Sequence, residues 1–322
     1  MVISIKYAMK NRKTMTNNYL ISIVIPIYNA SRYIKKFFKI LKKLNNAQIQ
    51  VIIIDDKSTD QTHIDIPTYI KRSNQKNVFF CKQSKNNGPG ICRNKGLKIA
   101  KGKFILFLDS DDDLRIINLI SLLKSKKLNS KNDLIIFDYI KQKKTNELNL
   151  AKTLIGKKKI IKLFLKTELD MCANFYLFNK NFLFKNKLIF KSGYYEDILF
   201  MLKTFHYAQK ITRYKKVIYI KNNNLNSITN TFSLKHLNNF IKSSEDKKLF
   251  FENIFTKKFK KNFQFLQYGL RGDYIFAKKI FKKLGNKTLK DNYCKNKFIK
   301  LLDNNFKVVT KYDYIVKKDF KL

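Results

Sequence analysis

The chain has 322 residues and 44% of them are hydrophobic, so we expect a sizeable core in one domain plus an extension. The formal net charge of +45 requires an acidic partner or surface, although 3 Pro and 0 Trp also indicate AT-rich coding. Charge alone therefore excludes none of three partners, which are nucleic acid, anionic lipid and phosphorylated substrates.

The cysteines and the apolar runs exclude several other classes. Cys81, Cys92, Cys172 and Cys294 lie far apart without CxxC spacing, so neither a zinc site nor a disulfide framework is predicted, and reduced cytosolic thiols are expected. No apolar run approaches the roughly 20 residues needed to cross a bilayer. Residues 1–18 lack the cleavage site of a secretory signal, and we interpret them as a loose basic tail with Met15 as a second candidate start.

Strands and helices alternate in the first 140 residues. Short continuous apolar runs predict buried strands at 20–27, 50–54, 78–81, 103–108 and 133–139. Apolar spacing and turn residues predict helices at 31–44, near 60, at 91–100 and at 115–128. This alternation predicts a mostly parallel, doubly wound α/β sheet.

Polar residues gather where the predicted strands end. They are Tyr28 and Asn29, Asp55 and Asp56, segment 86–90 and segment 109–113. Ligands of such sheets bind beyond the carboxyl ends of the strands, so this coincidence over several strands predicts a site there.

The most distinctive stretch is KFILFLDSDDD, residues 103–113. Carboxylates crowded at one strand end repel each other unless a cation or water lies between them, and such oxygen clusters suit Mg²⁺ or Mn²⁺. The alternative is a polar turn that caps the next helix, and this stays open for Asp113. An EF-hand is excluded, because Leu114 occupies the position that needs glycine.

The second half has weaker patterns. They predict an amphipathic helix at 157–166, an aromatic-rich segment at 174–183, a helix at 198–208, a strand at 216–221 and a basic helical region from 232 onward. Glu196 and Asp197 form an acidic pair at the predicted start of the 198–208 helix. The helix dipole stabilises acidic residues there, so helix capping is the alternative to a catalytic role.

The runs ISIVIPIYNASRYI, VIIIDDKSTDQT and NNGPGICRNKGLKIAKGKFILFLDSDDDL resemble the family 2 glycosyltransferases of bacterial surface-glycan synthesis. The resemblance is strong over residues 21–114 and weaker as far as 229. It implies a GT-A fold with a catalytic domain at 19–230, whose nucleotide-binding half is 19–115 and whose acceptor half is 116–230, and a basic helical C-terminal region at 231–322.

The resemblance also implies the chemistry. The donor would be a nucleotide sugar linked to UDP, the cofactor Mn²⁺ or Mg²⁺, and the acceptor a hydroxyl of a glycan or lipid. The transfer would be an inverting hexosyl or N-acetylhexosaminyl transfer for lipopolysaccharide, capsule or another polysaccharide. The expected location is cytoplasmic, and the Lys- and Phe-rich region 231–322 is expected to contact the anionic inner face of the membrane.

Eight residues receive roles from the matching motifs. On the donor side, Pro26 and Tyr28 would lie against the base, Asp56 would accept a hydrogen bond from uracil, and Arg93 would hold the nucleotide. Asp109 would face the ribose or the metal, and Asp111 would bind the metal that bridges the diphosphate. On the acceptor side, Asp197 would be the catalytic base, and Glu196 would orient the loop or contact the acceptor.

The sequence departs from its relatives on the acceptor side. It has no Trp near residues 174–177, and Ile220 stands where relatives often carry His. His63, His206 and His236 occupy no position of these motifs, and we expect them on the surface or in packing.

Two other functions fit part of the sequence. The charge and 14% aromatic residues suit a nucleic-acid-binding protein, but aspartates stand at the strand ends that phosphates would approach. A sugar nucleotidyltransferase would share the sheet and metal, but its Gly-rich, Arg-containing loop is absent from IPIYNASRY.

Overall fold

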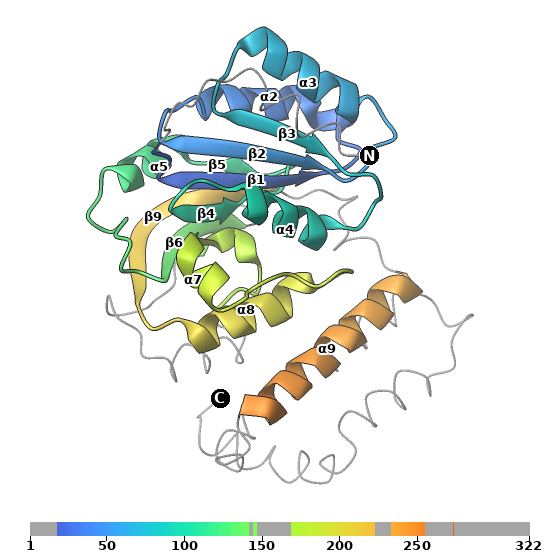
Figure 1. Ribbon diagram of the computed structural model, residues 1–322, viewed down its shortest axis with the longest axis vertical. Helices are drawn as coiled ribbons and strands as arrows, with labels where there is room; N and C mark the ends of the chain where they lie inside the picture. Colours follow the sequence, from blue (N-terminus) through green and yellow to red (C-terminus); the bar gives the residue numbers. More distant parts are fainter. Residues whose placement is uncertain (1–17, 142–143, 147–168, 223–232, 255–272, 274–322) are drawn as a thin grey trace. The chain divides into compact units, whose positions relative to one another are not determined.

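The computed structural model describes residues 18–141, 144–146, 169–222, 233–254 and 273 (Figure 1). The chain divides into two compact units, and the first contains the described residues up to 146 together with 170–222. The second unit contains Leu169, helix α9 (Leu234–Ile254) and Asp273. The predicted tail, the predicted helix at 157–166 and most of the region 231–322 lie outside the described residues.

In the first unit, nine strands of the described chain form one mixed sheet with the order β3-β2-β1-β4-β8-β6-β9-β5, and β7 pairs with β6. In chain order the strands are β1 (Ile21–Ile27), β2 (Ile49–Asp55), β3 (Val78–Lys82), β4 (Phe104–Phe107), β5 (Asp113–Leu114), β6 (Leu134–Lys141), β7 (Lys144–Asn146), β8 (Tyr176–Asn179) and β9 (Ile211–Lys221).

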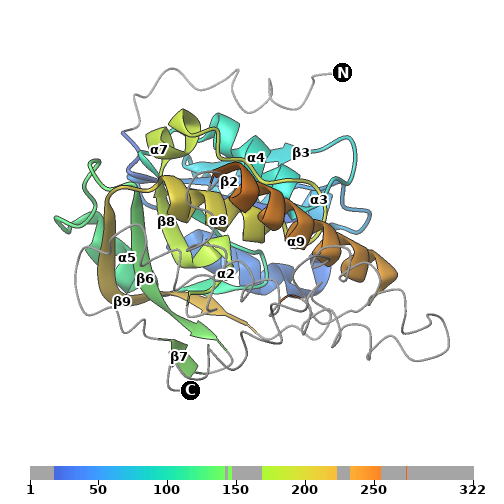
Figure 2. The same cartoon turned by 90° about the horizontal axis from the view of Figure 1, so that it is seen from below.

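The direction of each strand brings the predicted strand ends together. β1 to β4 are mutually parallel, as their continuous apolar runs predict, and every residue of β1, β2 and β4 is buried. β8 is antiparallel to both β4 and β6, and β9 is parallel to β6 (Figure 2). The carboxyl ends of β1, β2, β4, β6 and β9 therefore lie at one edge of the sheet.

Helices follow the strands closely. They are η1 (Ser31–Tyr33), α2 (Ile34–Lys43), α3 (Thr62–Ser73), α4 (Pro89–Ile99), α5 (Ile116–Leu123), η2 (Ala173–Phe175), α7 (Lys180–Lys185) and α8 (Glu196–Tyr207). Stacked rings of Phe38 and Tyr69, with centroids 4.2 Å apart, join α2 to α3. The predicted α/β sheet is confirmed.

Two details differ from expectation. Asp113 does not cap α5, whose N-cap is Arg115; it lies in β5, and its carboxylate accepts a hydrogen bond from the Leu114 N–H at 2.7 Å. A two-residue strand such as β5 has no periodicity to detect, because only its pairing with β9 defines it. α5 also ends at Leu123 rather than 128.

An aromatic cluster fixes the position of α8. Phe190 stacks on Phe200 of α8 with centroids 3.9 Å apart, and both rings contact Phe107 of β4 edge-on at 5.1 and 6.2 Å. All three side chains are fully buried, so the start of α8 is held beside the end of β4. The helices among the described residues include none that is long and apolar enough to span a membrane.

Candidate active site

The loop after β4 crosses the carboxyl edge of the sheet. β4 and β5 are joined by residues 108–112, yet β8, β6 and β9 separate them in the strand order. The loop is therefore anchored at both ends: the Leu108 N–H donates to the Val24 carbonyl at 3.1 Å, and β5 pairs with the end of β9. The aspartates of the predicted cluster are consequently held on a fixed path over the sheet.

A single guanidinium joins the β4 end to the acidic pair at the start of α8. Arg93 on α4 donates from Nη2 to Asp109 Oδ1 at 2.9 Å and from Nη1 to Glu196 Oε1 at 2.5 Å. Nη1 also lies 3.5 Å from Asp197 Oδ1. The guanidinium is buried, and it lies over the Phe190 ring at 5.4 Å from the centroid. Carboxylates from residues about a hundred positions apart thus meet at one cation.

Glycine permits this approach at the start of α4. A Cβ on Gly90 would lie 2.7 Å from the Lys191 carbonyl oxygen and 2.9 Å from Cγ of Glu196. On the other side, Tyr195 precedes α8 in the left-handed conformation, with φ of 62°. Such a backbone is uncommon for a residue with a side chain, and strain of this kind concentrates at functional sites.

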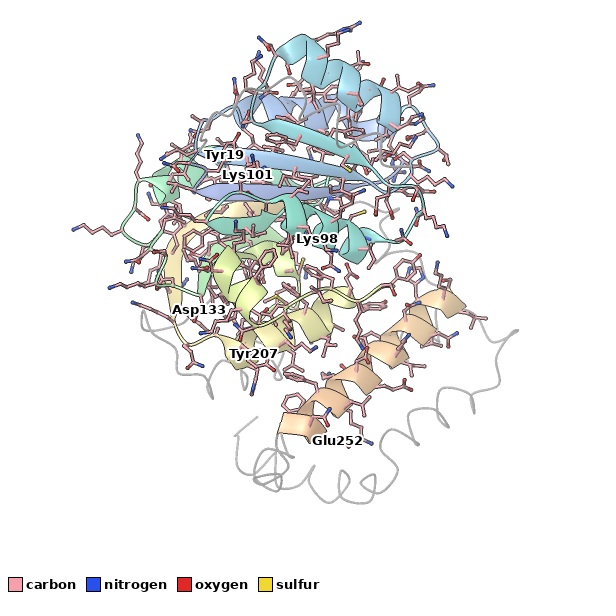
Figure 3. All side chains as sticks on the ribbon, in the orientation of Figure 1. Tyr19, Lys98, Lys101, Asp133, Tyr207 and Glu252 are labelled. Carbon is pink, nitrogen blue, oxygen red and sulfur yellow. The ribbon has the colours of Figure 1, made fainter. Side chains whose placement is uncertain are left out.

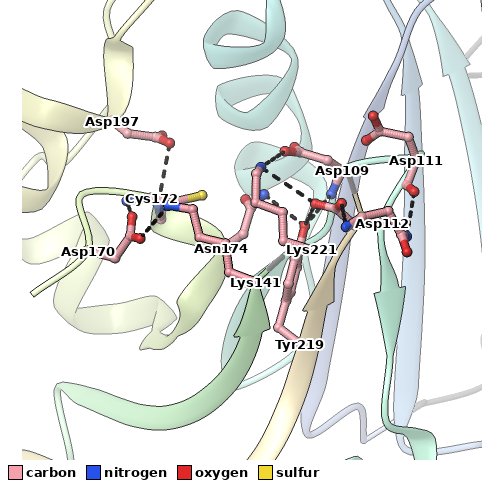
Figure 4. A network of polar contacts seen from close by, with 12 residues as sticks. Asp109, Asp111, Asp112, Lys141, Asp170, Cys172, Asn174, Asp197, Tyr219 and Lys221 are labelled. Carbon is pink, nitrogen blue, oxygen red and sulfur yellow. Dashed lines mark hydrogen bonds and ion pairs between the residues drawn. The ribbon is translucent and has the colours of Figure 1, made fainter. Parts of the chain in front are cut away.

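Asp112, the last aspartate of the loop, has structural partners (Figure 4). Asp112 is buried and accepts hydrogen bonds from the Tyr219 hydroxyl at 2.5 Å and from the Asn222 N–H at 2.8 Å. Asn174 Nδ2 donates to the same hydroxyl at 3.0 Å. Burial raises the pKa of Asp112 to about 7, against the opposing effect of Lys221. Asp112 is therefore part of the scaffold that holds the loop against β9.

Asp109 and Asp111 are the two loop carboxylates that the sequence assigns to a metal. The Asp109 side chain is 27% exposed, and although burial acts to raise its pKa, Arg93 and Lys221 hold the pKa below its usual range. Among the described residues, no group of three His, Cys, Asp or Glu side chains is arranged to hold a metal ion. Two carboxylates still suit Mg²⁺, which usually takes one or two from the protein and the rest from substrate phosphates and water.

Asp56 lies at the β2 end of the same edge. Its carboxylate accepts hydrogen bonds from the Asn87 and Gly88 N–H groups, at 2.9 and 2.8 Å, and from Gln83 Nε2 at 3.1 Å. It therefore fixes the loop that leads into α4. Tyr28, at the end of β1, has a 46% exposed side chain.

Asp197 has two properties that suit a general base. Burial raises its pKa to about 7; Arg93 opposes this, and Glu196 and Asp109 add to it. Oδ2 accepts a 3.4 Å hydrogen bond from the Ala173 N–H, while buried Oδ1 has no hydrogen-bond partner in the described structure and only the 3.5 Å ion pair with Arg93. A carboxyl group whose pKa is near 7 can take up a proton at physiological pH.

The family model described as Glycosyl transferase family 2 matches residues 22–189, which is more than half of the chain. The chain belongs to glycosyl transferase family 2. The match includes the loop after β4, Arg93 and the end of β1, and it stops just before the acidic pair on α8.

Curated relatives of this family 2 member are glycosyltransferases that match over short segments. A 94-residue segment is 40% identical to a poly(ribitol-phosphate) beta-glucosyltransferase of Bacillus spizizenii, over 29% of this chain and 15% of that protein. Two further curated relatives match over 38% and 39% of their own length, so the chain spans well under two thirds of these proteins.

Solved structures confirm the fold. Staphylococcus aureus TarS with UDP-GlcNAc has a TM-score of 0.65 and 22% identity, covering 84% of this chain and 76% of that one. Mannosyltransferase PcManGT of Pyrobaculum calidifontis with GDP-Man and Mn²⁺ has a TM-score of 0.53 and 11% identity, covering 95% and 86%. The expected GT-A fold is thereby confirmed.

The structure brings five of the eight predicted residues of this family 2 chain into one area. Arg93, Asp109, Glu196 and Asp197 are in contact, and Asp111 lies two residues from Asp109 on the same loop. Pro26, Tyr28 and Asp56 stand along the same edge, at the ends of β1 and β2. Sequence analysis missed Tyr219 and Lys221, because only the pairing of β9 with β5 reveals that the end of β9 reaches the loop.

Proposed function

We propose that this chain transfers a sugar from a UDP-linked donor to a hydroxyl of a glycan or lipid-linked acceptor, with inversion. The product would be a cell-surface polysaccharide, lipooligosaccharide or capsule. The observation that carries the proposal is the shared ion pairing of Arg93, because it brings the β4 carboxylate of Asp109 beside the acidic pair Glu196 and Asp197. A sugar transfer needs both a leaving-group side and a base, and these two groups provide them.

The donor would lie along the edge from β1 to β4. Tyr28 offers an exposed ring for the base, and Pro26 lies two residues before it at the end of β1. Asp56 already accepts three hydrogen bonds, but a carboxylate has about four lone-pair sites, so one remains for uracil. TarS, similar in fold, binds UDP-GlcNAc, and this supports a UDP sugar as the donor.

Asp109 and Asp111 would hold Mn²⁺ or Mg²⁺ beside the diphosphate. Bound there, a divalent cation neutralises charge that develops on the leaving diphosphate. PcManGT, similar in fold, contains Mn²⁺ with its nucleotide sugar. Arg93 contributes indirectly: it fixes the rotamer of Asp109, since its buried guanidinium is engaged with carboxylates on both sides.

Asp197 would be the general base. The acceptor hydroxyl gives its proton to Asp197, and its oxygen forms a bond to the anomeric carbon. The bond from that carbon to the UDP oxygen breaks on the opposite face, and UDP leaves with the electron pair. Glu196 stays paired with Arg93 at 2.5 Å and would keep the start of α8 in position while this happens.

The test is a screen of nucleotide sugars with the full chain. We expect UDP-glucose or UDP-N-acetylglucosamine with Mn²⁺ to raise the melting temperature, and the same compound to be hydrolysed slowly without acceptor. GDP-mannose and ADP-glucose are the matched controls. Stabilisation by no nucleotide sugar, with or without metal, would contradict the proposal.

A further inference from the structure

Lys221 brings a positive charge to the edge where the donor would bind. It is the last residue of β9, whose carboxyl end lies at the same edge of the sheet as that of β4. Its Nζ lies 3.9 Å from Asp109 Oδ2 and 3.8 Å from Asp112 Oδ2 (Figure 4). The side chain is 29% exposed and that of Asp109 is 27% exposed, so both are partly open to solvent.

These two contacts leave the hydrogen-bonding capacity of the ammonium unused. Charge-assisted hydrogen bonds between nitrogen and oxygen are about 2.7–2.9 Å long, so distances near 4 Å are ion pairs only. An ammonium has three N–H donors, and neither carboxylate takes one of them directly. A lysine side chain is ordinarily protonated at neutral pH, so the amine carries a positive charge.

Arg93, the other cation of the site, already has carboxylate partners. Arg93 donates to Asp109 and Glu196 and lies 3.5 Å from Asp197, so three carboxylates surround its charge. A diphosphate that approaches Asp109 and Asp111 meets like charge, and it needs further positive charge besides a divalent cation. Lys221 is placed to supply it.

We infer that the Lys221 ammonium binds the donor's diphosphate directly, as a fixed cation beside the metal. The inference rests on the proposed function, because it requires a nucleoside diphosphate at this edge. A lysine acts on phosphate as a point charge on a flexible stem, which suits an ammonium about 4 Å from two carboxylates. Part of the affinity for UDP then persists when the metal is removed.

Calorimetry of uridine and UDP binding, with chelator present, tests this. Wild type should bind UDP about tenfold or more tightly than uridine, since a charged hydrogen bond is involved. Lys221→Met should lose that advantage and keep its uridine affinity, while Lys221→Arg should retain most of it. Lys141→Met is the matched control: Lys141 ends the neighbouring strand β6 but pairs with Asp170 at 3.0 Å, and this variant should bind as wild type does.

Several results would overturn the inference. One is equal metal-free affinity of wild type for uridine and UDP, a comparison that needs no variant. Another is UDP binding by Lys221→Met as tight as in wild type, and a third is an equal loss of uridine and UDP affinity, which marks a role in folding only. Failure of wild type to bind UDP even with Mn²⁺ would instead contradict the proposed function, and this inference with it.

Discussion

At the scale of single residues, the base and the metal ligands can be separated by experiment. Asp197→Asn should lower kcat by about 10²–10⁴, the usual effect of losing a general base, and leave the affinity for UDP-sugar nearly unchanged. A matched control is Asp133→Asn, on the amino side of β6, where the carboxylate accepts from the Gln209 and Lys210 N–H groups. Equal loss of donor affinity and turnover would make Asp197 a structural residue.

The pH profile gives an independent check on the same residue. Burial raises the pKa of Asp197 to about 7, and only the ionised carboxylate can accept the proton of the acceptor hydroxyl. We therefore expect kcat/KM to rise as pH increases through about 7 and then to level off. The rising limb should be absent from the residual activity of Asp197→Asn; its persistence there would assign the limb to another group.

The metal prediction concerns Asp111. With Mn²⁺ present, UDP should bind more tightly than with chelator, and Asp111→Asn should remove most of that difference while the protein stays folded. Asp113→Asn, at the start of β5, is the matched control, because the Asp113 carboxylate accepts a hydrogen bond from the Leu114 N–H. An unchanged effect of Mn²⁺ in Asp111→Asn would exclude Asp111 as a metal ligand.

The sequence shows where the loop carboxylates lie relative to a strand, and the reason is local. Asp109 and Asp111 follow a continuous apolar strand, so one stretch of sequence contains both the strand and its polar end. Tyr219 and Lys221 lie more than a hundred positions further along the chain than the loop aspartates that they contact. No local sequence pattern encodes these contacts. The partners of Arg93 were hidden for the same reason, since Glu196 lies 103 positions further along the chain.

At the scale of elements, the tight contact between α4 and β1 positions Arg93. A Cβ on Gly96 would lie 2.2 Å from Cγ1 of Val24, whose side chain is stiff and fully buried. Gly96→Ala should therefore destabilise the protein by about 1–3 kcal/mol through overpacking, measured by denaturant unfolding. Lys98→Ala, at an exposed position of the same helix (Figure 3), should change stability much less. Equal stability of wild type and Gly96→Ala would mean that α4 can move away from the sheet.

The predicted elements were right in type wherever the apolar pattern was strong. β1 to β4 and α4 match their predicted segments within two residues, and α2 starts three residues later than predicted, because burial on both faces or one face imposes a clear pattern. The segment 174–183 did not indicate one structure, and it contains η2, β8 and the start of α7. Its aromatic residues are all buried although they belong to three different elements, so neither a strand nor a helix period appears.

At the scale of the whole molecule, a small part of the net charge of +45 lies on the exposed face of α2. Its exposed positions are all lysines, namely Lys35, Lys36, Lys39, Lys42 and Lys43, and its buried face is Ile34, Phe37, Ile40 and Leu41. We expect salt-sensitive binding to anionic vesicles, since each lysine near such a surface contributes about 1 kcal/mol. The basic region 231–322, where this contact was first predicted, lies mostly outside the described residues.

Flotation with anionic and neutral vesicles measures the salt-sensitive binding expected for α2. Lys39→Glu with Lys42→Glu should weaken binding to anionic vesicles, and Lys71→Glu with Arg72→Glu on α3 is a control with the same charge change. Absence of salt-sensitive binding in wild type would contradict peripheral contact. Equal weakening by both pairs would show that total charge matters and not the face of α2.

The return of β9 to the loop after β4 also sets an order of assembly during synthesis. The parallel strands β1 to β4 are complete once residue 107 has emerged, and their pairings span 27 to 83 positions. The bonds of Tyr219 and Asn222 to the Asp112 carboxylate span 107 and 110 positions, and contacts so distant in sequence form late. A growing chain therefore carries the aspartates of the donor edge long before it carries Lys221 and the residues that clamp their loop. Competence to bind a nucleotide should appear abruptly near the end of the first unit's synthesis, rather than accumulate strand by strand.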